Sequence, residues 1–366
     1  MHNKPLKIAA VLFLLLGAVI ACKETDDTGT GETFKRGLLL EQIGNEFILP
    51  AFDRFEKSVN ALSVALNTFA SAPDATHLLA AQTAWEAAFM DFQAVRGFTF
   101  GPGEQDLIGD LNENLGTWPI DTAKVQQRIG ASDLVMNDFR RDTRGLLALE
   151  YLLFEPHALS RFQASSSNLR MDYLLALNQD IQNWAQTQKA AWLGYIPSFI
   201  VDESKAAGSS TSELYNHWLQ NFEGIKNFKL ALPAGLRVGQ TQAEPRLVES
   251  AYAHLSIRSI KVHLQHIERL WYGNGLDGSA GIGFDDYLEK VEGGQALKLE
   301  TIKQWEAIHT EMAKFQESED LAVLVIQDPQ KVSDLLMELQ KMTHFLKSDL
   351  SSLLGISITY SSGDGD

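Results

Sequence analysis

Apolar residues recur at intervals of three and four positions from Phe34 almost to the C-terminus, and no alternating apolar-polar run is longer than a few residues. Spacings of three and four are typical of amphipathic helices, whereas alternation is typical of half-buried strands. The pattern therefore predicts an all-α protein. Each half of the chain has room for roughly four long helices. We expect two four-helix bundles packed together, over residues 34–165 and 166–356, with their junction at the serines 165–167.

Prolines and capping residues set the expected helix boundaries. Pro50 should break or kink a first helix over residues 35–70, and Asp74 should cap a second helix that ends near Arg96. Glycines indicate an irregular loop over residues 97–119. Asp328 precedes a proline and suits the start of the last helix. Further helices are expected over residues 131–154, 168–192, 211–230, 246–272, 294–316 and 329–354, before a frayed tail over residues 357–366.

The N-terminus is expected to lie outside the fold. Lys4 and Lys7 precede an apolar run over residues 8–21 that is too short for the roughly 20 residues of a membrane-spanning helix. It is typical of a signal peptide, here residues 1–21. The run ends in Val-Ile-Ala-Cys, which resembles the lipobox of bacterial lipoproteins, so Cys22 is predicted to be lipidated. The alternative is an ordinary signal peptide followed by an isolated cysteine.

Residues 22–33 are polar and acidic, and we expect them to tether the folded body to a membrane surface through the lipid on Cys22. This predicts the cell envelope of a Gram-negative-type bacterium, with the protein on the outer membrane, in the periplasm or facing outward. The formal charge of the whole chain is −16, and residues 1–21 hold two lysines and no acid, so the remainder carries about −18. Such a charge argues against nucleic-acid binding. Cys22 is the single cysteine, which excludes disulfides and thiolate metal sites.

One carboxylate stands in an apolar segment, since GLLALEYLLF over residues 145–154 has Glu150 as its only charge. On the helix predicted over residues 131–154, Glu150 shares an arc with Phe139 and is flanked by Val135. An ionised carboxylate there is costly unless it is paired, bound to a metal or protonated. A salt bridge to Arg96 or Arg144 is the structural alternative to a functional site.

Four segments, in order, carry a resemblance: AWEAAFMDFQAVRGFTFGP (84–102), TWPID (117–121), RGLLALEYLLF (144–154), and KLALPAGLRVG with PRLVESAYAHLS (229–256). Together they resemble the imelysin family, over about residues 36–355. That family includes bacterial lipoproteins, periplasmic proteins linked to iron uptake, and a proposed metallopeptidase. The Trp118-Pro119-x-Asp121 element and the helix from Gly145 to Glu150 are the most specific parts of the resemblance.

The resemblance also implies a metal site. The family's helix carries Gly-x-His-x-x-Glu, whose His and Glu are the proposed ligands of a metal ion, here expected to be iron or zinc. Gly145 and Glu150 match the motif, but Leu147 stands at the histidine position. Leucine cannot bind a metal, so the site is expected to be altered or lost. His157, seven residues beyond Glu150, could replace the histidine only if the chain turned back sharply.

A second candidate lies on the helix predicted over residues 246–272. Glu249, Ser256 and His263 are seven residues apart and would form one stripe within its apolar arc, with His266 at the edge. Such a row resembles the lining of a polar cavity, which would face Glu150 across the junction of the bundles. The alternative is ordinary packing of buried polar residues.

Three further residues are singled out near these segments. Trp118 is expected to pack rather than to stack on a ligand, and Asp121 to cap a short helix that begins near Thr122. Arg96, at the end of a helix beside the glycine loop, is a potential partner for Glu150.

Three functions are compatible with these features. The first is a non-catalytic lipoprotein for iron or metal uptake, whose altered site binds a metal ion or a small ligand. The second is a metallopeptidase, which would need Glu150, Glu249 and His263 to converge on one metal ion. The third is a scaffold in which leucine fills the cavity and Glu150 pairs with an arginine. The sequence identifies no protein partner.

Overall fold

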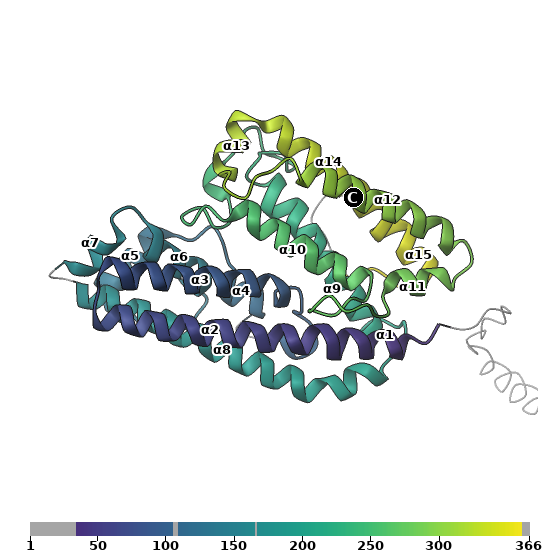
Figure 1. Ribbon diagram of the computed structural model, residues 1–366, viewed down its shortest axis with the longest axis horizontal. Helices are drawn as coiled ribbons and strands as arrows, with labels where there is room; N and C mark the ends of the chain where they lie inside the picture. Colours follow the sequence, from purple (N-terminus) through teal and green to yellow (C-terminus); the bar gives the residue numbers. More distant parts are fainter. Residues whose placement is uncertain (1–33, 105–108, 165–166, 361–366) are drawn as a thin grey trace, which may run out of the picture. The chain divides into compact units, whose positions relative to one another are not determined.

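Helices make up most of the described part of the chain, and no strand occurs in it (Figure 1). The structure is a computed structural model that describes residues 34–104, 109–164 and 167–360. The prediction of an all-α protein is confirmed. Within these ranges no helix is long and apolar enough to cross a membrane. The predicted signal peptide and tether, and residues 361–366 of the predicted tail, lie outside the described residues.

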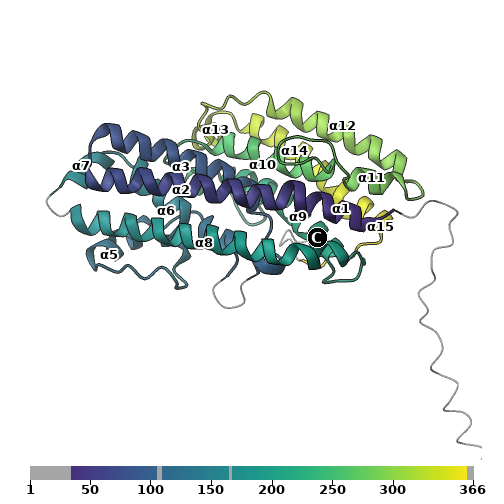
Figure 2. The ribbon, with the colours of Figure 1, turned by 60° about the horizontal axis from the view of Figure 1, so that its bottom comes forward.

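A first group of helices packs around a core rich in phenylalanine and leucine. Helix α2 lies along both α3 and α8, and the short helix α6 contacts α3 and α8 (Figures 1 and 2). On α2 the buried residues recur every three or four positions, from Phe52 and Phe55 to Leu62 and Leu66, as the sequence pattern predicts. The bounds of the group are α2 Leu49–Ser71, α3 Ala75–Val95, α6 Gly145–Phe154 and α8 Ser167–Val201.

A second group of helices follows in the sequence. Helix α12 packs against α14, and α10 contacts both α9 and the π-helical segment η4 that continues α9. Helix α10 also packs along α3 and so connects the two groups (Figure 1). The bounds are α9 Ser210–Gly224, η4 Ile225–Ala231, α10 Ser256–Trp271, α12 Gly294–Met312, α14 Pro329–His344, η6 Phe345–Leu350 and α15 Ser351–Leu354.

Short elements connect these helices. They are α1 Arg36–Ile43, η1 Gly44–Ile48, η2 Gly101–Gly103, α4 Leu111–Leu115, α5 Thr122–Gly130, η3 Arg141–Thr143, α7 Ala158–Gln163, η5 Pro245–Leu247, α11 Phe284–Glu289 and α13 Leu321–Gln327.

From Phe34 onward the chain forms one compact unit. The division into two domains near residue 165 stays a prediction, and residues 165 and 166 lie outside the described residues.

Pro50 does not break the first helix but changes its winding. Because proline has no N–H, it cannot donate to the carbonyl of Glu46, four residues earlier. The chain forms the π-helical segment η1 just before this point, and the Glu46 carbonyl instead accepts a hydrogen bond from the N–H of Leu276, 2.8 Å away. The altered winding therefore ties the start of α2 to a loop far away in the sequence.

Three predicted helix caps are confirmed. The carboxylates of Asp74, Asp121 and Asp328 each accept a hydrogen bond from the backbone N–H three residues further on, at the starts of α3, α5 and α14. This is the usual role of an N-cap aspartate. Asp121 thus acts as the cap that the sequence favoured.

The helix predicted over residues 131–154 is wrong in its first half. Helix α5 ends at Gly130, residues 131–140 are irregular, and α6 begins only at Gly145. Val135 and Phe139, which the predicted helix placed beside Glu150, are 53% and 79% exposed. The chain deviates because Arg128 and Arg144 donate hydrogen bonds to backbone carbonyls of residues 135 and 136, which holds this segment out of helical geometry.

The helix predicted over residues 246–272 is also wrong in its first part, because α10 begins at Ser256. Ser250 and His254 have φ angles of 55° and 57°, in the left-handed region that interrupts a helix. Glu249 therefore lies in a turn and not on the same helix as His263, so the predicted three-residue stripe does not exist.

Gly145 occupies a position that only glycine fits. Its φ is +77°, and an added Cβ would lie 2.7 Å from the carbonyl oxygens of Asn114 and Leu115. We expect Gly145→Ala to lower the free energy of unfolding by about 2 kcal/mol or more, since the left-handed backbone alone costs about 1–2 kcal/mol. Chemical denaturation would measure this change. The control is Gly130→Ala at the end of α5, where an added Cβ meets nothing within 4 Å and a neutral or slightly stabilising effect is expected. Equal effects of the two substitutions would contradict the steric argument.

Candidate ligand-binding site

Glu150 lies inside the protein and is bonded to a turn rather than to a cation. Its side chain is 1% exposed. One carboxylate oxygen, Oε1, accepts hydrogen bonds from the Ser250 hydroxyl at 3.0 Å and from the backbone N–H groups of Tyr252 and Ala253 at 3.0 and 2.8 Å. Glu150 therefore holds the turn over residues 249–254 against α6.

Burial raises the pKa of Glu150 to about 7, although its three hydrogen bonds favour the ionised form. The nearby Glu249 carboxylate adds to the rise. Near neutral pH this carboxyl group is therefore divided between its protonated and ionised forms.

The predicted pairing of Glu150 with an arginine is wrong. Arg96 donates to Glu249, at 2.7 Å. Arg144 donates to the Asn114 side chain and the Met136 carbonyl. Glu150 is bonded to backbone N–H groups and not to the arginine that the sequence led us to expect.

Glu249 is the centre of a buried ionic cluster, which we define as Glu249, Arg96, Lys229 and Gln93. All four side chains are at least 96% buried. Glu249 Oε1 accepts from Arg96 Nη1 at 2.7 Å, and Oε2 pairs with Lys229 Nζ at 2.8 Å. Gln93 Oε1 accepts from both cations, at 3.0 and 2.8 Å. The two cations come from the end of α3 and from η4, so the cluster joins the two groups of helices.

Burial and charge shift the titration of the cluster. Burial alone would raise the pKa of Glu249, but Arg96 and Lys229 outweigh it and hold that pKa below its ordinary value. Burial lowers the pKa of Lys229 to about 7, against the opposing effect of Glu249. Glu249 is therefore ionised at neutral pH, while Lys229 titrates there.

The other predicted site residues lie around this cluster. Ser256 donates to the backbone carbonyl of Glu249 and so fixes the turn. His263 is buried, and its Nε2 donates to Asn221 Oδ1 at 2.8 Å, while burial keeps its pKa well below the ordinary value. The Trp118 ring lies 5.5 Å from the Arg96 guanidinium, and its Nε1 donates to the Leu247 carbonyl. The structure thus brings Glu249, Ser256, His263, Arg96 and Trp118 together, although not as a helical stripe.

A cavity of about 160 Å³ opens beside the ionic cluster. Most of its lining residues have polar side chains, and the aromatic rings of Trp118 and Phe228 add apolar surface. Burial lowers the pKa of His217 in this wall to about 4, and raises that of Asp110 to about 6. The lining residues are Arg96, Gly97, Thr99, Asp110, Asn112, Trp118, His217, Gln220, Asn221, Gly224, Phe228, Lys229 and His263.

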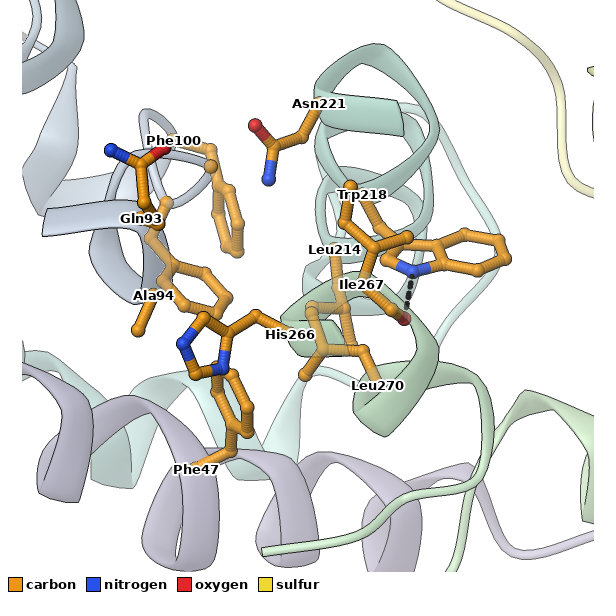
Figure 3. Close-up of a pocket in the computed structure, with 12 residues that line it drawn as sticks. Phe47, Gln93, Ala94, Phe100, Leu214, Trp218, Asn221, His266, Ile267 and Leu270 are labelled. Carbon is orange, nitrogen blue, oxygen red and sulfur yellow. Dashed lines mark hydrogen bonds between the residues drawn. The ribbon is translucent and has the colours of Figure 1, made fainter. Parts of the chain in front are cut away.

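A smaller void of about 10 Å³ shares Gly97 and Asn221 with this cavity (Figure 3). Figure 3 shows the His266 ring beside Phe47, and neither ring nitrogen of His266 has a hydrogen-bond partner. Burial lowers the pKa of His266 to about 3, so the ring is neutral. A void of this size holds about one water molecule.

The described residues do not fit the iron or zinc site that the family motif implies. Leu147 is 3% exposed and packs in the apolar core. His157 is exposed at the start of α7, with no described bond to Glu150. Within residues 34–104, 109–164 and 167–360, no group of three or more His, Cys, Asp or Glu side chains could hold a metal ion. A protein ligand set for a tightly held transition metal is therefore missing from this part of the chain.

Comparison with known proteins decides the family. The sequence profile of the imelysin family, peptidase family M75, matches residues 48–348. The chain belongs to the imelysin family. A curated relative of this imelysin-family protein is "Iron-regulated protein A" of Synechococcus elongatus, 27% identical over 176 residues, which are 47% of this chain and 43% of the relative. The match thus spans less than half the length of that relative.

Two solved structures share the fold of this imelysin-family protein. An imelysin-like protein from Psychrobacter arcticum superposes with a TM-score of 0.71, at 16% identity, over 90% of this chain and 99% of its own. A protein from Parabacteroides distasonis, described as an iron-regulated protein A precursor, has a TM-score of 0.74 at 16% identity, over 89% of this chain and 97% of its own. At this identity the likeness establishes the fold.

Sequence reasoning missed Lys229, Gln93 and Asn221. Lys229 could have been found by the criterion that found Glu150, because it is the only charge in the apolar segment FKLALPAGL over residues 228–236. Gln93 and Asn221 carry no charge and lie on helices α3 and α9 without a distinguishing spacing, so no local pattern marks them.

Proposed function

We propose that this imelysin-family protein is a lipid-anchored binding protein of the bacterial cell envelope that serves iron acquisition without hydrolysing a substrate. The supporting observation is a cavity whose wall contains Arg96 and Lys229, two buried basic side chains that are both paired with Glu249. A concave site with a few convergent polar groups is the usual form of a small-ligand site. The link to iron comes from the family and from the name of its relative in Synechococcus elongatus.

The state of the two buried carboxylates favours binding over catalysis. Glu150 Oε1 accepts three hydrogen bonds from the turn, and both oxygens of Glu249 are paired with cations. A general base must reach a water molecule beside the substrate. Neither carboxylate is arranged for that role, and Leu147 stands at the position that the resemblance assigns to the motif's histidine.

The test compares iron uptake in the native host with and without the gene, under iron limitation. We expect the deletion strain to take up radiolabelled iron more slowly, and the wild-type gene to restore uptake. In the same strains Cys22→Ala is expected to move the protein from the membrane fraction to the soluble fraction. Equal iron uptake in all strains would refute the role in iron acquisition.

A peptidase assay on the purified full-length protein tests the non-catalytic part of the proposal. We expect no cleavage of unstructured protein substrates above the level of a Glu150→Gln control. Cleavage that disappears in Glu150→Gln would instead establish the metallopeptidase.

A further inference from the structure

The cavity beside the ionic cluster offers more hydrogen-bond donors than the protein itself uses. Arg96 bonds only through Nη1, to Gln93 and Glu249. A guanidinium has five N–H donors, so the donors on Nε and Nη2 have no partner among the described residues. The Lys229 ammonium has three N–H donors and two described partners, Gln93 and Glu249. Both side chains line the cavity, which gives the remaining donors a place to act.

The cavity wall has two basic side chains, both from the ionic cluster, and one carboxylate, that of Asp110. Arg96 and Lys229 face one ionised carboxylate, Glu249, whose two oxygens are already paired. The histidines in the wall, His217 and His263, are neutral because burial lowers the pKa of each. Asp110 is the opposing charge; its side chain caps α4, and burial raises its pKa to about 6.

Neutral donors extend the same surface. Because Asn221 Oδ1 accepts from His263, the Asn221 amide is oriented, and its Nδ2 donates to no described residue. The Asn221 side chain borders both the cavity and the small void next to it. An oriented amide beside a guanidinium and an ammonium can donate to the oxygens of a single bound group.

We propose that this cavity binds a small carboxylate anion, held by donors of Arg96, Lys229 and Asn221. A guanidinium matches a carboxylate with two parallel hydrogen bonds, which gives this pairing both affinity and orientation. The cavity volume of about 160 Å³ is far larger than the void of about 10 Å³ beside it, which is the space of about one water molecule. This size suits a hydroxycarboxylate or dicarboxylate and excludes a folded peptide. The anion binds either in its free form or as the chelator of a metal ion. The second case rests on the proposed role in iron acquisition.

Gly224 offers a way to close the cavity without disturbing the cluster. It lines the cavity at the end of α9, its φ is −58°, and an added Cβ meets nothing within 4 Å. Gly224→Leu should therefore fold normally and occupy the space of the ligand. Gly194→Leu on the exposed side of α8 is the matched control, since an added Cβ there also meets nothing within 4 Å and Gly194 does not line the cavity.

The experiment is isothermal titration calorimetry on the full-length protein in detergent micelles, with sodium citrate and ferric citrate as probes and sodium chloride at matched ionic strength as the blank. We expect citrate to bind the wild type and Gly194→Leu equally, and to bind Gly224→Leu at least tenfold more weakly. Ferric citrate that binds at least tenfold more tightly than citrate identifies the metal chelate as the cargo. Equal affinities identify the free carboxylate.

Absence of citrate and ferric citrate binding to the wild type, or equal binding to Gly224→Leu, would refute the carboxylate site. A thermal melt of each variant checks that it is folded. The proposed role in iron acquisition is judged separately, because slower iron uptake by the deletion strain together with no citrate binding would refute only the carboxylate site.

The pH dependence of binding gives a second readout. Between pH 6 and 8 Lys229 loses its proton and Asp110 and the nearby Glu150 become ionised, while Glu249 stays ionised and His217 and His263 stay neutral. Citrate affinity should therefore fall about tenfold over this interval. An affinity that rises with pH would contradict the assignment of Lys229 to the anion.

Discussion

Glu249→Gln is expected to lower the free energy of unfolding by about 3 kcal/mol or more. The substitution keeps the shape of the side chain but leaves Arg96 and Lys229 buried without their counter-charge. Lys229 can release its proton in response, whereas an arginine cannot. Chemical denaturation at pH 7 would measure the loss.

Two further variants separate the charge effect from a general loss of packing. Glu300→Gln removes one partner of an exposed ion pair with Lys303 and should change stability by less than about 0.5 kcal/mol. Adding Lys229→Met to Glu249→Gln removes one of the two uncompensated cations, so the double variant should be more stable than Glu249→Gln alone. If the double variant lost as much stability as Glu249→Gln and Lys229→Met lose together, the cluster would act through shape rather than charge.

The parts of the fold that depend on local chemistry were predictable. The caps at Asp74, Asp121 and Asp328 follow from one residue and its near neighbours in the sequence. The segments over residues 131–144 and 246–255 were not, because long-range bonds decide them. Arginine side chains hold the first segment away from helical geometry, and hydrogen bonds to Glu150 hold the second as a turn.

The candidate site shows the same limit. That Glu150 would be buried followed from the apolar residues around it, and this is confirmed. Its partners did not follow, because backbone N–H groups look alike at every position of a sequence. The predicted use of Glu150, Glu249, Ser256 and His263 as one ligand site stays a prediction. Glu150 is nevertheless linked to the ionic cluster. Ser250 donates a hydrogen bond to Glu150 and directly follows Glu249 in the chain.

Glu150→Gln should change how stability depends on pH. The pKa of Glu150 is raised from an ordinary value of 4.5 to about 7 in the folded protein. A raised carboxyl pKa means that the folded state holds a proton that the unfolded state has released. Its stabilising effect is fully present below pH 4.5 and is lost as the pH rises through 7. Glutamine cannot ionise, keeps an acceptor oxygen for the turn, and so should not show this loss.

The measurement is the difference in unfolding free energy between Glu150→Gln and the wild type, determined by denaturation at intervals from pH 5 to pH 8. We expect the variant to gain about 2.5 kcal/mol relative to the wild type over this range, because each unit of pKa shift corresponds to about 1.4 kcal/mol and part of the shift is already expressed at pH 5. Other groups that titrate here, such as Asp180 with its pKa of about 6, are present in both proteins and cancel in the difference. Parallel stability curves for the two proteins would contradict the raised pKa. They would mean that Glu150 is ionised over the whole range, and that the turn over residues 249–254 binds its carboxylate and not its protonated form.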